Sequence, residues 1–182
     1  VQDGLPSNSI RDITQLNDGT LIIACYKAGV ATFDGKKFTL FNDGLDDKRV
    51  ILLENGFDGE IWAGTESAGI GVLEQDQFRM IRDSDGLAHN EMFSLYNDGK
   101  RMWAGTFGGG VSCFYDNTWF TLRESDGLNS NTVGSIVSVD ENTTMIGGTS
   151  GVSIFKTNNK KFSLEMADIL TPSEELSFDK QM

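Results

Sequence analysis

The chain of 182 residues is poor in the residues that build most catalytic and metal centres. It has one histidine, His89, and two cysteines, Cys25 and Cys113. A zinc site needs several His or Cys residues at ligand spacing. A Ser-His-Asp arrangement would have to use His89, and no nucleophile elbow accompanies it. We therefore expect no catalytic residue, no metal and no cofactor, and we expect the two cysteines to be free, buried thiols.

Positive charge and long apolar runs are also scarce. Fifteen Lys and Arg residues stand against 27 Asp and Glu residues, and the net charge is −12. Phosphate backbones and anionic membrane surfaces attract clustered cations, so this charge argues against nucleic acid and a membrane surface as partners. No apolar run approaches the roughly 20 residues that span a bilayer. A membrane would be reached only through parts absent from this chain.

What the chain does contain is a repeat. Asp-Gly-Leu occurs four times, with its glycine at Gly4, Gly44, Gly86 and Gly127, and the steps are 40, 42 and 41 residues. Each period holds four short apolar runs separated by turns rich in Asp and Gly. Four short antiparallel strands in about 41 residues are typical of one blade of a β-propeller. The two prolines, Pro6 and Pro172, fall outside the expected strands, as an all-β fold requires.

We predict an all-β fold with four propeller blades at about residues 3–42, 43–84, 85–125 and 126–166. The expected second strands are 21–25, 61–65, 102–106 and 145–149, and Trp62 and Trp103 should be buried between blades, with Phe33, Phe114 and Phe155 at the same interfaces. Ile146 takes the Trp position in blade four. Residues 167–182 are a tail or the start of a fifth blade. The segment would then be part of a larger ring, and its end faces would self-associate or contact the missing blades.

The best-formed repeats are Ile61–Thr65 (Ile-Trp-Ala-Gly-Thr) and Met102–Val111, and the opening is Gly4–Ile10 (Gly-Leu-Pro-Ser-Asn-Ser-Ile). This pattern resembles the two-component regulator propeller repeat over residues 3–166. The resemblance implies a periplasmic sensor region of a hybrid histidine kinase, often responding to glycan breakdown products. The chain opens on a loop in mid-pattern, so we expect an excised piece or a precursor that has lost its leader.

Function should lie where the copies differ, because the shared residues build the frame. Loops between blades and loops from second to third strands share one rim of a propeller, and binding residues concentrate on such loops. In our alignment Tyr26 matches Thr65, and Cys25 matches Gly64. The candidate ligand contacts, for an oligosaccharide or another small molecule, are Lys48, Arg49, Glu66, His89, Asn90 and Phe107. Trp119 stands among polar equivalents, which suggests contact with a partner.

Three functions remain open at this point. The first is a non-enzymatic extracytoplasmic sensor segment that binds a ligand or partner through its rim. The second is a propeller lyase that resembles the streptogramin lyases, for which a single histidine is a weak basis. The third is a propeller with a purely structural or protein-interaction role.

Overall fold

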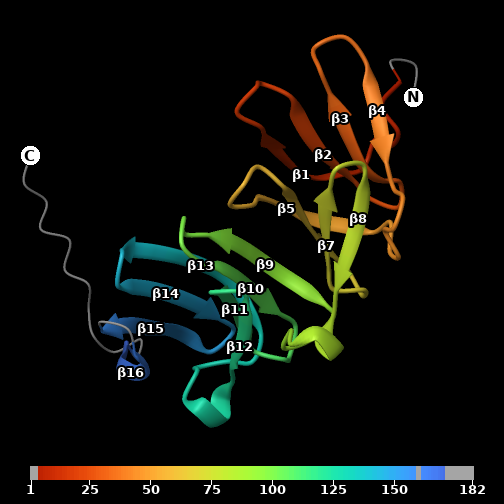
Figure 1. The fold of residues 1–182 in the computed structure, drawn as a ribbon. Coiled ribbons are helices and arrows are strands. Elements are labelled where there is room, and N and C mark those ends of the chain that lie inside the picture. Colours follow the sequence, from red (N-terminus) through yellow and green to blue (C-terminus); the bar gives the residue numbers. More distant parts are fainter. Residues whose placement is uncertain (1–3, 159–160, 171–182) are drawn as a thin grey trace, which may run out of the picture.

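The computed structural model describes residues 4–158 and 161–170. Sixteen strands form four separate antiparallel sheets, and in each sheet the four strands follow one another in chain order (Figure 1). These sheets are four blades of a β-propeller, as the repeat predicts. Within the described ranges there is no α-helix, and no helix there is long and apolar enough to cross a membrane.

The strand bounds follow the predicted runs closely. Blade one contains β1 (Ile10–Gln15), β2 (Leu21–Cys25), β3 (Gly29–Phe33) and β4 (Phe38–Phe41). Blade two contains β5 (Val50–Asn55), β6 (Ile61–Thr65), β7 (Ile70–Glu74) and β8 (Gln77–Ile81). Blade three contains β9 (Met92–Asn97), β10 (Met102–Thr106), β11 (Val111–Tyr115) and β12 (Thr118–Leu122). Blade four contains β13 (Val133–Asp140), β14 (Thr143–Gly148), β15 (Gly151–Asn158) and β16 (Lys161–Leu170).

The last strand reaches beyond the predicted end of blade four. Residues 167–170 continue β16, where Ala167 pairs with Ile154 and Leu170 with Val152. The remainder of the expected tail or fifth-blade start, residues 171–182, lies outside the described residues.

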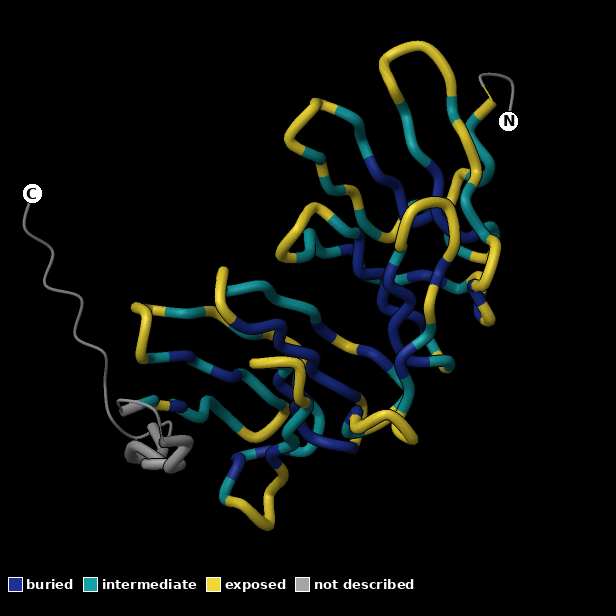
Figure 2. The backbone as a smooth tube through the Cα atoms, viewed as in Figure 1, coloured by how far each residue is buried: buried dark blue, intermediate teal, exposed yellow. Residues whose placement is uncertain are grey.

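The first strand of each blade lies on the inner side of an open arc (Figure 1). β1 contacts β5, β5 contacts β9, and β9 contacts β13, and the other extensive strand contacts between blades are β2 with β5, β6 with β9 and β10 with β13. Buried residues run through the middle of the blades, and exposed residues gather in the turns at both rims (Figure 2).

Apolar side chains fill the space between successive blades. Trp62 and Trp103 are 3% and 0% exposed, which confirms that both indoles are buried. Trp62 lies 6.0 Å from Phe114 of the next blade, and Trp103 lies 5.1 Å from Phe155, measured between ring centroids. Large buried aromatics dominate the energetics of such interfaces, so this pair of contacts holds blades two, three and four together.

Phe33 differs from its two equivalents because no described blade precedes blade one. It stacks on Phe38 of its own blade at 4.6 Å, over a small cluster that contains Cys25. At the other end of the arc, Val137 and Val139 are 51% and 62% exposed on the face that would meet a following blade. On blade one, Ile13 and Leu40 are exposed on the face that carries Ile23 and Ala31. Both end faces therefore keep apolar side chains uncovered among the described residues.

The sheet register corrects the Trp position in blade four. Trp103 pairs with Cys113, and Met145 pairs with Ile154 at the equivalent place. Met145, and not Ile146, therefore occupies the Trp position. The pair Gly-Thr at 148–149 looks like the pair at 105–106, but the connection from the second to the third strand is one residue shorter in blade four. An alignment that matches the two Gly-Thr pairs is therefore shifted by one residue.

The Asp-Gly-Leu motif joins each blade to the next. Gly44 has φ +80°, and a Cβ there would lie 2.1 Å from the carbonyl oxygen of Phe78 on β8, so only glycine fits. The leucines that follow, Leu45, Leu87 and Leu128, are all buried at the blade interfaces. The motif thus brings the connecting backbone against the outer strand of the next blade and inserts a leucine between the two sheets.

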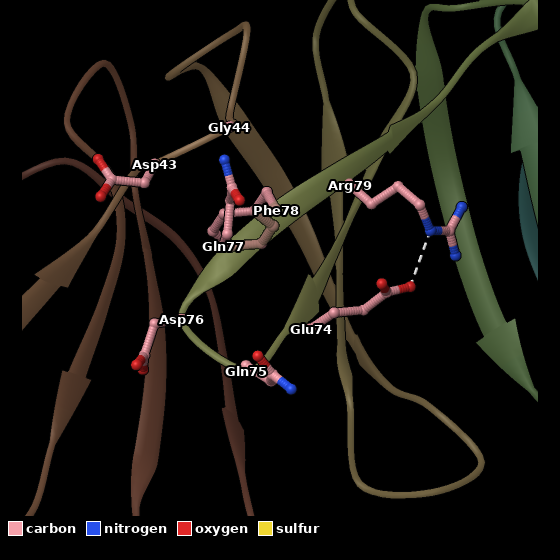
Figure 3. Close-up of a pocket in the computed structure, with 8 residues that line it drawn as sticks. All are labelled: Asp43, Gly44, Glu74, Gln75, Asp76, Gln77, Phe78 and Arg79. Atoms are coloured by element: carbon pink, nitrogen blue, oxygen red, sulfur yellow. Dashed lines mark hydrogen bonds and ion pairs between the residues drawn. The ribbon is translucent and has the colours of Figure 1, made fainter.

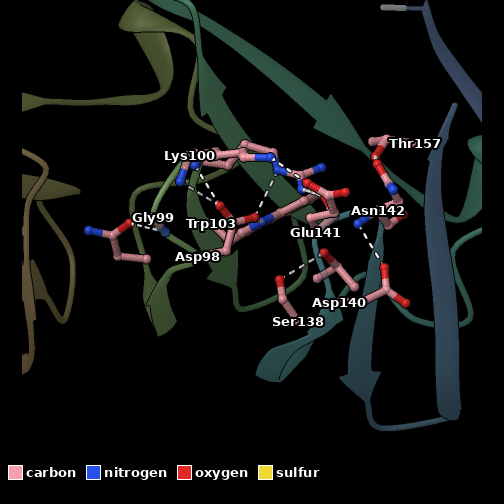
Figure 4. A network of polar contacts seen from close by, with 12 residues as sticks. Asp98, Gly99, Lys100, Trp103, Ser138, Asp140, Glu141, Asn142 and Thr157 are labelled. Carbon is pink, nitrogen blue, oxygen red and sulfur yellow. Dashed lines mark hydrogen bonds and ion pairs between the residues drawn. The ribbon is translucent and has the colours of Figure 1, made fainter. Parts of the chain in front are cut away.

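A buried polar cluster connects blades three and four at the rim formed by the turns between first and second strands (Figure 4). The side chains of Arg101 and Asp98 are 5% and 3% exposed and form an ion pair at 2.8 Å. Trp103 Nε1 donates to the same Asp98 carboxylate at 3.0 Å, and Arg101 donates to the carbonyl oxygen of Glu141 in blade four at 2.9 Å. The buried charges are therefore paired, as burial requires.

Candidate functional site

The two sets of loops named above meet at one rim, as predicted. The N–H of Glu66 donates to the carbonyl of Arg49 within blade two, and the N–H of Gly69 donates to the carbonyl of Asn90 in blade three. Equivalent bonds recur along the rim at Tyr26–Ser9, Phe107–Glu91, Thr149–Thr132, Gly29–Lys48 and Gly110–Asn131. Each rim loop is thus held by its own blade and by the next, so the side chains stand on a fixed backbone.

The register corrects the alignment of the second loop set by one residue. Cys25 pairs with Gly29 at the end of β2, and Thr65 bonds Gly69 in the same way in blade two. Cys25 therefore matches Thr65, and Tyr26 matches Glu66. Counting backward from the shared glycines, instead of forward through the apolar run, would have given this match from the sequence.

Every inner strand carries a β-bulge just below the rim. The pairing with the second strand skips one residue near the start of the strand in all four blades. The bulged residues are Arg11, Ile51, Phe93 and Gly134. A bulge redirects one side chain out of the regular alternation, so each blade presents one variable residue beside its rim loop.

In blade one the bulged residue meets the rim loop directly. The Arg11 guanidinium lies 4.4 Å from the centre of the Tyr26 ring, and the Lys27 ammonium lies 5.7 Å from the same centre. The Tyr26 hydroxyl donates to the carboxylate of Glu66 in blade two at 3.0 Å. A cation–π contact and a hydrogen bond therefore connect the rims of the first two blades.

The structure brings the predicted residues Arg49 and Glu66 together. Arg49 Nη1 lies 3.1 Å from the Glu66 carboxylate, and Arg49 also bonds Asp47 at 2.9 Å and the Ser67 hydroxyl at 2.6 Å. Burial acts to raise the pKa of Asp47, but hydrogen bonds from Arg49 and Ser67 outweigh it and hold that pKa below its usual value. Arg49 thus has its donors engaged within the protein.

In blade three the bulged residue and the rim residue are both aromatic. Phe93 and Phe107 are 47% and 51% exposed, and their rings meet edge to face with centroids 6.0 Å apart. Phe93 also lies over Gly134 of blade four, where a Cβ would approach its ring at 3.1 Å. Exposed aromatic rings on a fixed frame offer an apolar surface to a ligand.

The other predicted contacts have local bonds as well. Asn90 is half-buried, and its side-chain oxygen accepts the N–H of Asp83 at 2.8 Å. His89 is exposed, and its Nδ1 accepts the N–H of Glu91 at 3.1 Å. Lys48 is exposed, and its carbonyl accepts the N–H of Gly29. The structure places all of these residues at the rim, and their contact with a ligand stays a prediction.

Trp119 has an intramolecular role. It is half-buried on β12, with its ring 5.2 Å from Phe114 and 6.1 Å from Trp62. A side chain in place of Gly86 would come into close contact with the Trp119 Cβ. The indole therefore covers the interface of blades two and three from outside, and contact with a partner stays a prediction.

Sequence reasoning missed Arg11 and Phe93. A bulge leaves no mark in a continuous apolar run, so Arg11 and Phe93 read as ordinary strand positions. The signal that could have found them is the variation of this position between blades. The preceding residue is apolar in every blade, whereas the bulged residue is basic in one blade, aliphatic in another, aromatic in a third and glycine in the fourth. Tyr26 was assigned to the rim but left out of the candidate contacts, because these were confined to blades two and three, which have neighbours on both sides.

One hollow of the surface lies away from this rim (Figure 3). It is an open groove of about 830 Å³ at the outer edge of blades one and two, lined by Asp43, Gly44 and the stretch 74–79. Arg79 and Glu74, on the β7–β8 hairpin at its side, form an ion pair at 2.8 Å. None of the predicted ligand residues lines this groove. Over residues 4–158 and 161–170, no three His, Cys, Asp or Glu side chains are grouped to hold a metal ion.

Comparison with solved structures supports the propeller fold. The extracellular domain of a protein described as a hybrid two-component system, BT3049 from B. thetaiotaomicron, superposes with a TM-score of 0.74 at 20% identity, over 90% of this chain and 25% of that one. The corresponding domain of BT4673 gives 0.70 at 17% identity, over 90% and 24%. Virginiamycin B lyase from Staphylococcus aureus gives 0.61 at 14% identity, over 92% and 59%.

These likenesses define the architecture and leave the family open. No family model matches the chain, and no curated protein matches it. The chain spans about a quarter of the length of the two-component extracellular domains. The class that the fold defines is therefore a segment of a β-propeller similar to those extracellular domains.

Proposed function

We propose that this segment belongs to the periplasmic sensor region of a two-component signalling protein and binds a saccharide fragment at the inner end of its rim. The observation that carries the proposal is the contact of a bulged residue with a rim residue in blades one and three. The frame around these pairs repeats, whereas the pairs themselves change from Arg11–Tyr26 to Phe93–Phe107. Variation confined to one face of a fixed scaffold is typical of a binding surface.

The chemistry at the rim suits a sugar. Phe93 and Phe107 offer exposed ring surface for the apolar face of a pyranose, and nearby polar groups can bond its hydroxyls. The similarity to extracellular domains of two-component systems supports the sensor role. The uncovered faces of blades one and four support completion of the ring by further blades, or self-association of the isolated segment.

Thermal unfolding with a panel of neutral and acidic oligosaccharides tests this function. A ligand that binds the folded state raises the apparent melting temperature. We expect the shift to disappear in Phe93→Ala and Phe107→Ala and to persist in Phe57→Ala, which removes an exposed aromatic from the opposite rim. A panel that produces no shift would favour the purely structural propeller.

A lyase is the alternative, favoured by the superposition with virginiamycin B lyase over 92% of this chain. We propose that the segment has no such activity. His89→Ala should then leave the fold intact, because it removes one exposed hydrogen bond worth about 0.5–1.5 kcal/mol. Assays of the wild type on oligosaccharides and on cyclic lactones should show no turnover. A turnover that vanishes in His89→Ala would replace the sensor by an enzyme.

A further inference from the structure

We propose that the saccharide bound at this rim is anionic, and that Arg11, Lys27 and Lys48 hold its carboxylate or sulfate group at the junction of blades one and two. The inference rests on the proposed function and assigns the charge of its ligand. The three residues are exposed, and none forms an ion pair with a described residue.

The three cations are gathered by the fold. Arg11 and Lys27 both lie beside the Tyr26 ring, at 4.4 Å and 5.7 Å from its centre. The loop that carries Lys27 bonds the next blade, because the Gly29 N–H donates to the Lys48 carbonyl at 3.1 Å. Lys27 also has φ 64°, a backbone region that non-glycine residues seldom adopt, and the equivalent residue in blade three is a glycine, Gly108.

The carboxylates around these cations are engaged elsewhere. Glu66 accepts from Tyr26 and Arg49, and Asp47 accepts from Arg49 and Ser67. Asp46 is paired with Arg82. Asp12 accepts the backbone N–H groups of Ile13 and Leu53. The cations Arg11, Lys27, Lys48, Arg49 and Arg82 thus stand beside the carboxylates Asp12, Asp46, Asp47 and Glu66, and Arg11, Lys27 and Lys48 have no ion-pair partner among the described residues. On a chain whose net charge is −12, this small local excess of positive charge attracts an anion.

The contacts distinguish two adjacent cations, Arg49 and Lys48, that the sequence pattern offered equally as ligand contacts. Arg49 buttresses the rim, since its guanidinium is bound to Asp47, Glu66 and Ser67. Lys48, the preceding residue, is exposed and forms no ion pair with a described residue. A guanidinium and two ammonium groups bind a carboxylate or sulfate by charge-assisted hydrogen bonds, while Phe93 and Phe107 on the same rim are left for an apolar sugar face.

The test is calorimetric titration of the wild-type segment with acidic oligosaccharides and with the same oligosaccharides made neutral. Suitable probes are oligogalacturonides and chondroitin sulfate oligosaccharides, each with its carboxyl-reduced or desulfated form. We expect the acidic form to bind about tenfold or more tightly than its neutral form, with affinity that falls as salt rises. The two probe types show whether carboxylate or sulfate is preferred.

Charge-neutral variants localise the effect. Arg11→Gln, Lys27→Gln and Lys48→Gln should each weaken binding of the acidic form more than binding of the neutral form, and so reduce the preference for the acidic form. Lys36→Gln is the matched control, because it removes an exposed cation from the turn between β3 and β4 of blade one. Its preference should equal that of the wild type.

The other outcomes overturn one claim or both. Equal binding of acidic and neutral forms refutes the anionic assignment and leaves the saccharide sensor standing. Binding of oligoglutamate as tightly as the acidic saccharide refutes a saccharide-specific site. Failure of every saccharide, acidic or neutral, refutes the proposed function together with this inference.

Discussion

Replacing Trp103 with alanine should lower the free energy of unfolding by about 3–5 kcal/mol, the usual loss for a large buried aromatic. The indole is 0% exposed and packs edge to face on Phe120 and Phe155, with centroids 6.1 Å and 5.1 Å away. Truncation would open a cavity in the interface of blades three and four. Urea unfolding followed by tryptophan fluorescence and circular dichroism measures the loss.

Phenylalanine at the two Trp positions provides the matched comparison. Trp103 Nε1 donates to Asp98, whereas the buried Trp62 Nε1 has no hydrogen-bond partner among the described residues. Trp103→Phe should therefore cost more than Trp62→Phe, because only the former deprives a buried carboxylate of a donor. A loss below about 1 kcal/mol for Trp103→Ala would contradict the packing described here.

Removal of the Asp98 carboxylate should be about as damaging as loss of the tryptophan. Asp98→Ala leaves the Arg101 guanidinium buried without its counter-charge, and breaking a buried pair on one side costs about 3–5 kcal/mol. The carboxylate also accepts the backbone N–H groups of Lys100 and Arg101, which shape the turn. The same unfolding experiment measures the effect.

Two variants establish that the effect comes from the unpaired buried charge. Asp98→Ala combined with Arg101→Met should recover part of the loss, because no unpaired charge is then buried. Lys100→Ala removes the exposed ion pair with Glu141 and should cost at most about 1 kcal/mol. A double variant that is less stable than Asp98→Ala alone would show that Arg101 contributes mainly through packing.

Much of the fold was predictable because the blade is encoded locally. The spacing of Asp-Gly-Leu gave the repeat, and the apolar runs gave four second strands to within two residues. Errors of one residue arose at two places. The shorter loop after β14 displaced the Trp position from Met145 to Ile146, and counting forward from β2 displaced Tyr26. Such shifts are invisible to apolar periodicity, because a neighbouring residue of similar polarity fits each position.

The sequence predicted which loops form the rim, but it did not predict the bulged residues at the inner end of the rim. That blade-joining loops and second-to-third-strand loops share one rim follows from propeller topology, and their hydrogen bonds confirm it. The bulges that present Arg11 and Phe93 depend on pairing between strands, which a single sequence does not display. Whether a charge is free or engaged, as for Lys48 and Arg49, also depends on contacts between blades.

Backbone amide shifts, recorded by NMR while an acidic oligosaccharide is titrated into the labelled segment, test most directly where the ligand binds. Binding at the inner rim predicts the largest shifts at Arg11, Lys27 and Lys48, followed by Phe93 and Phe107. Shifts concentrated at the turns of the opposite rim, residues 57–59 and 98–100, would contradict the choice of face and the ligand site built on it.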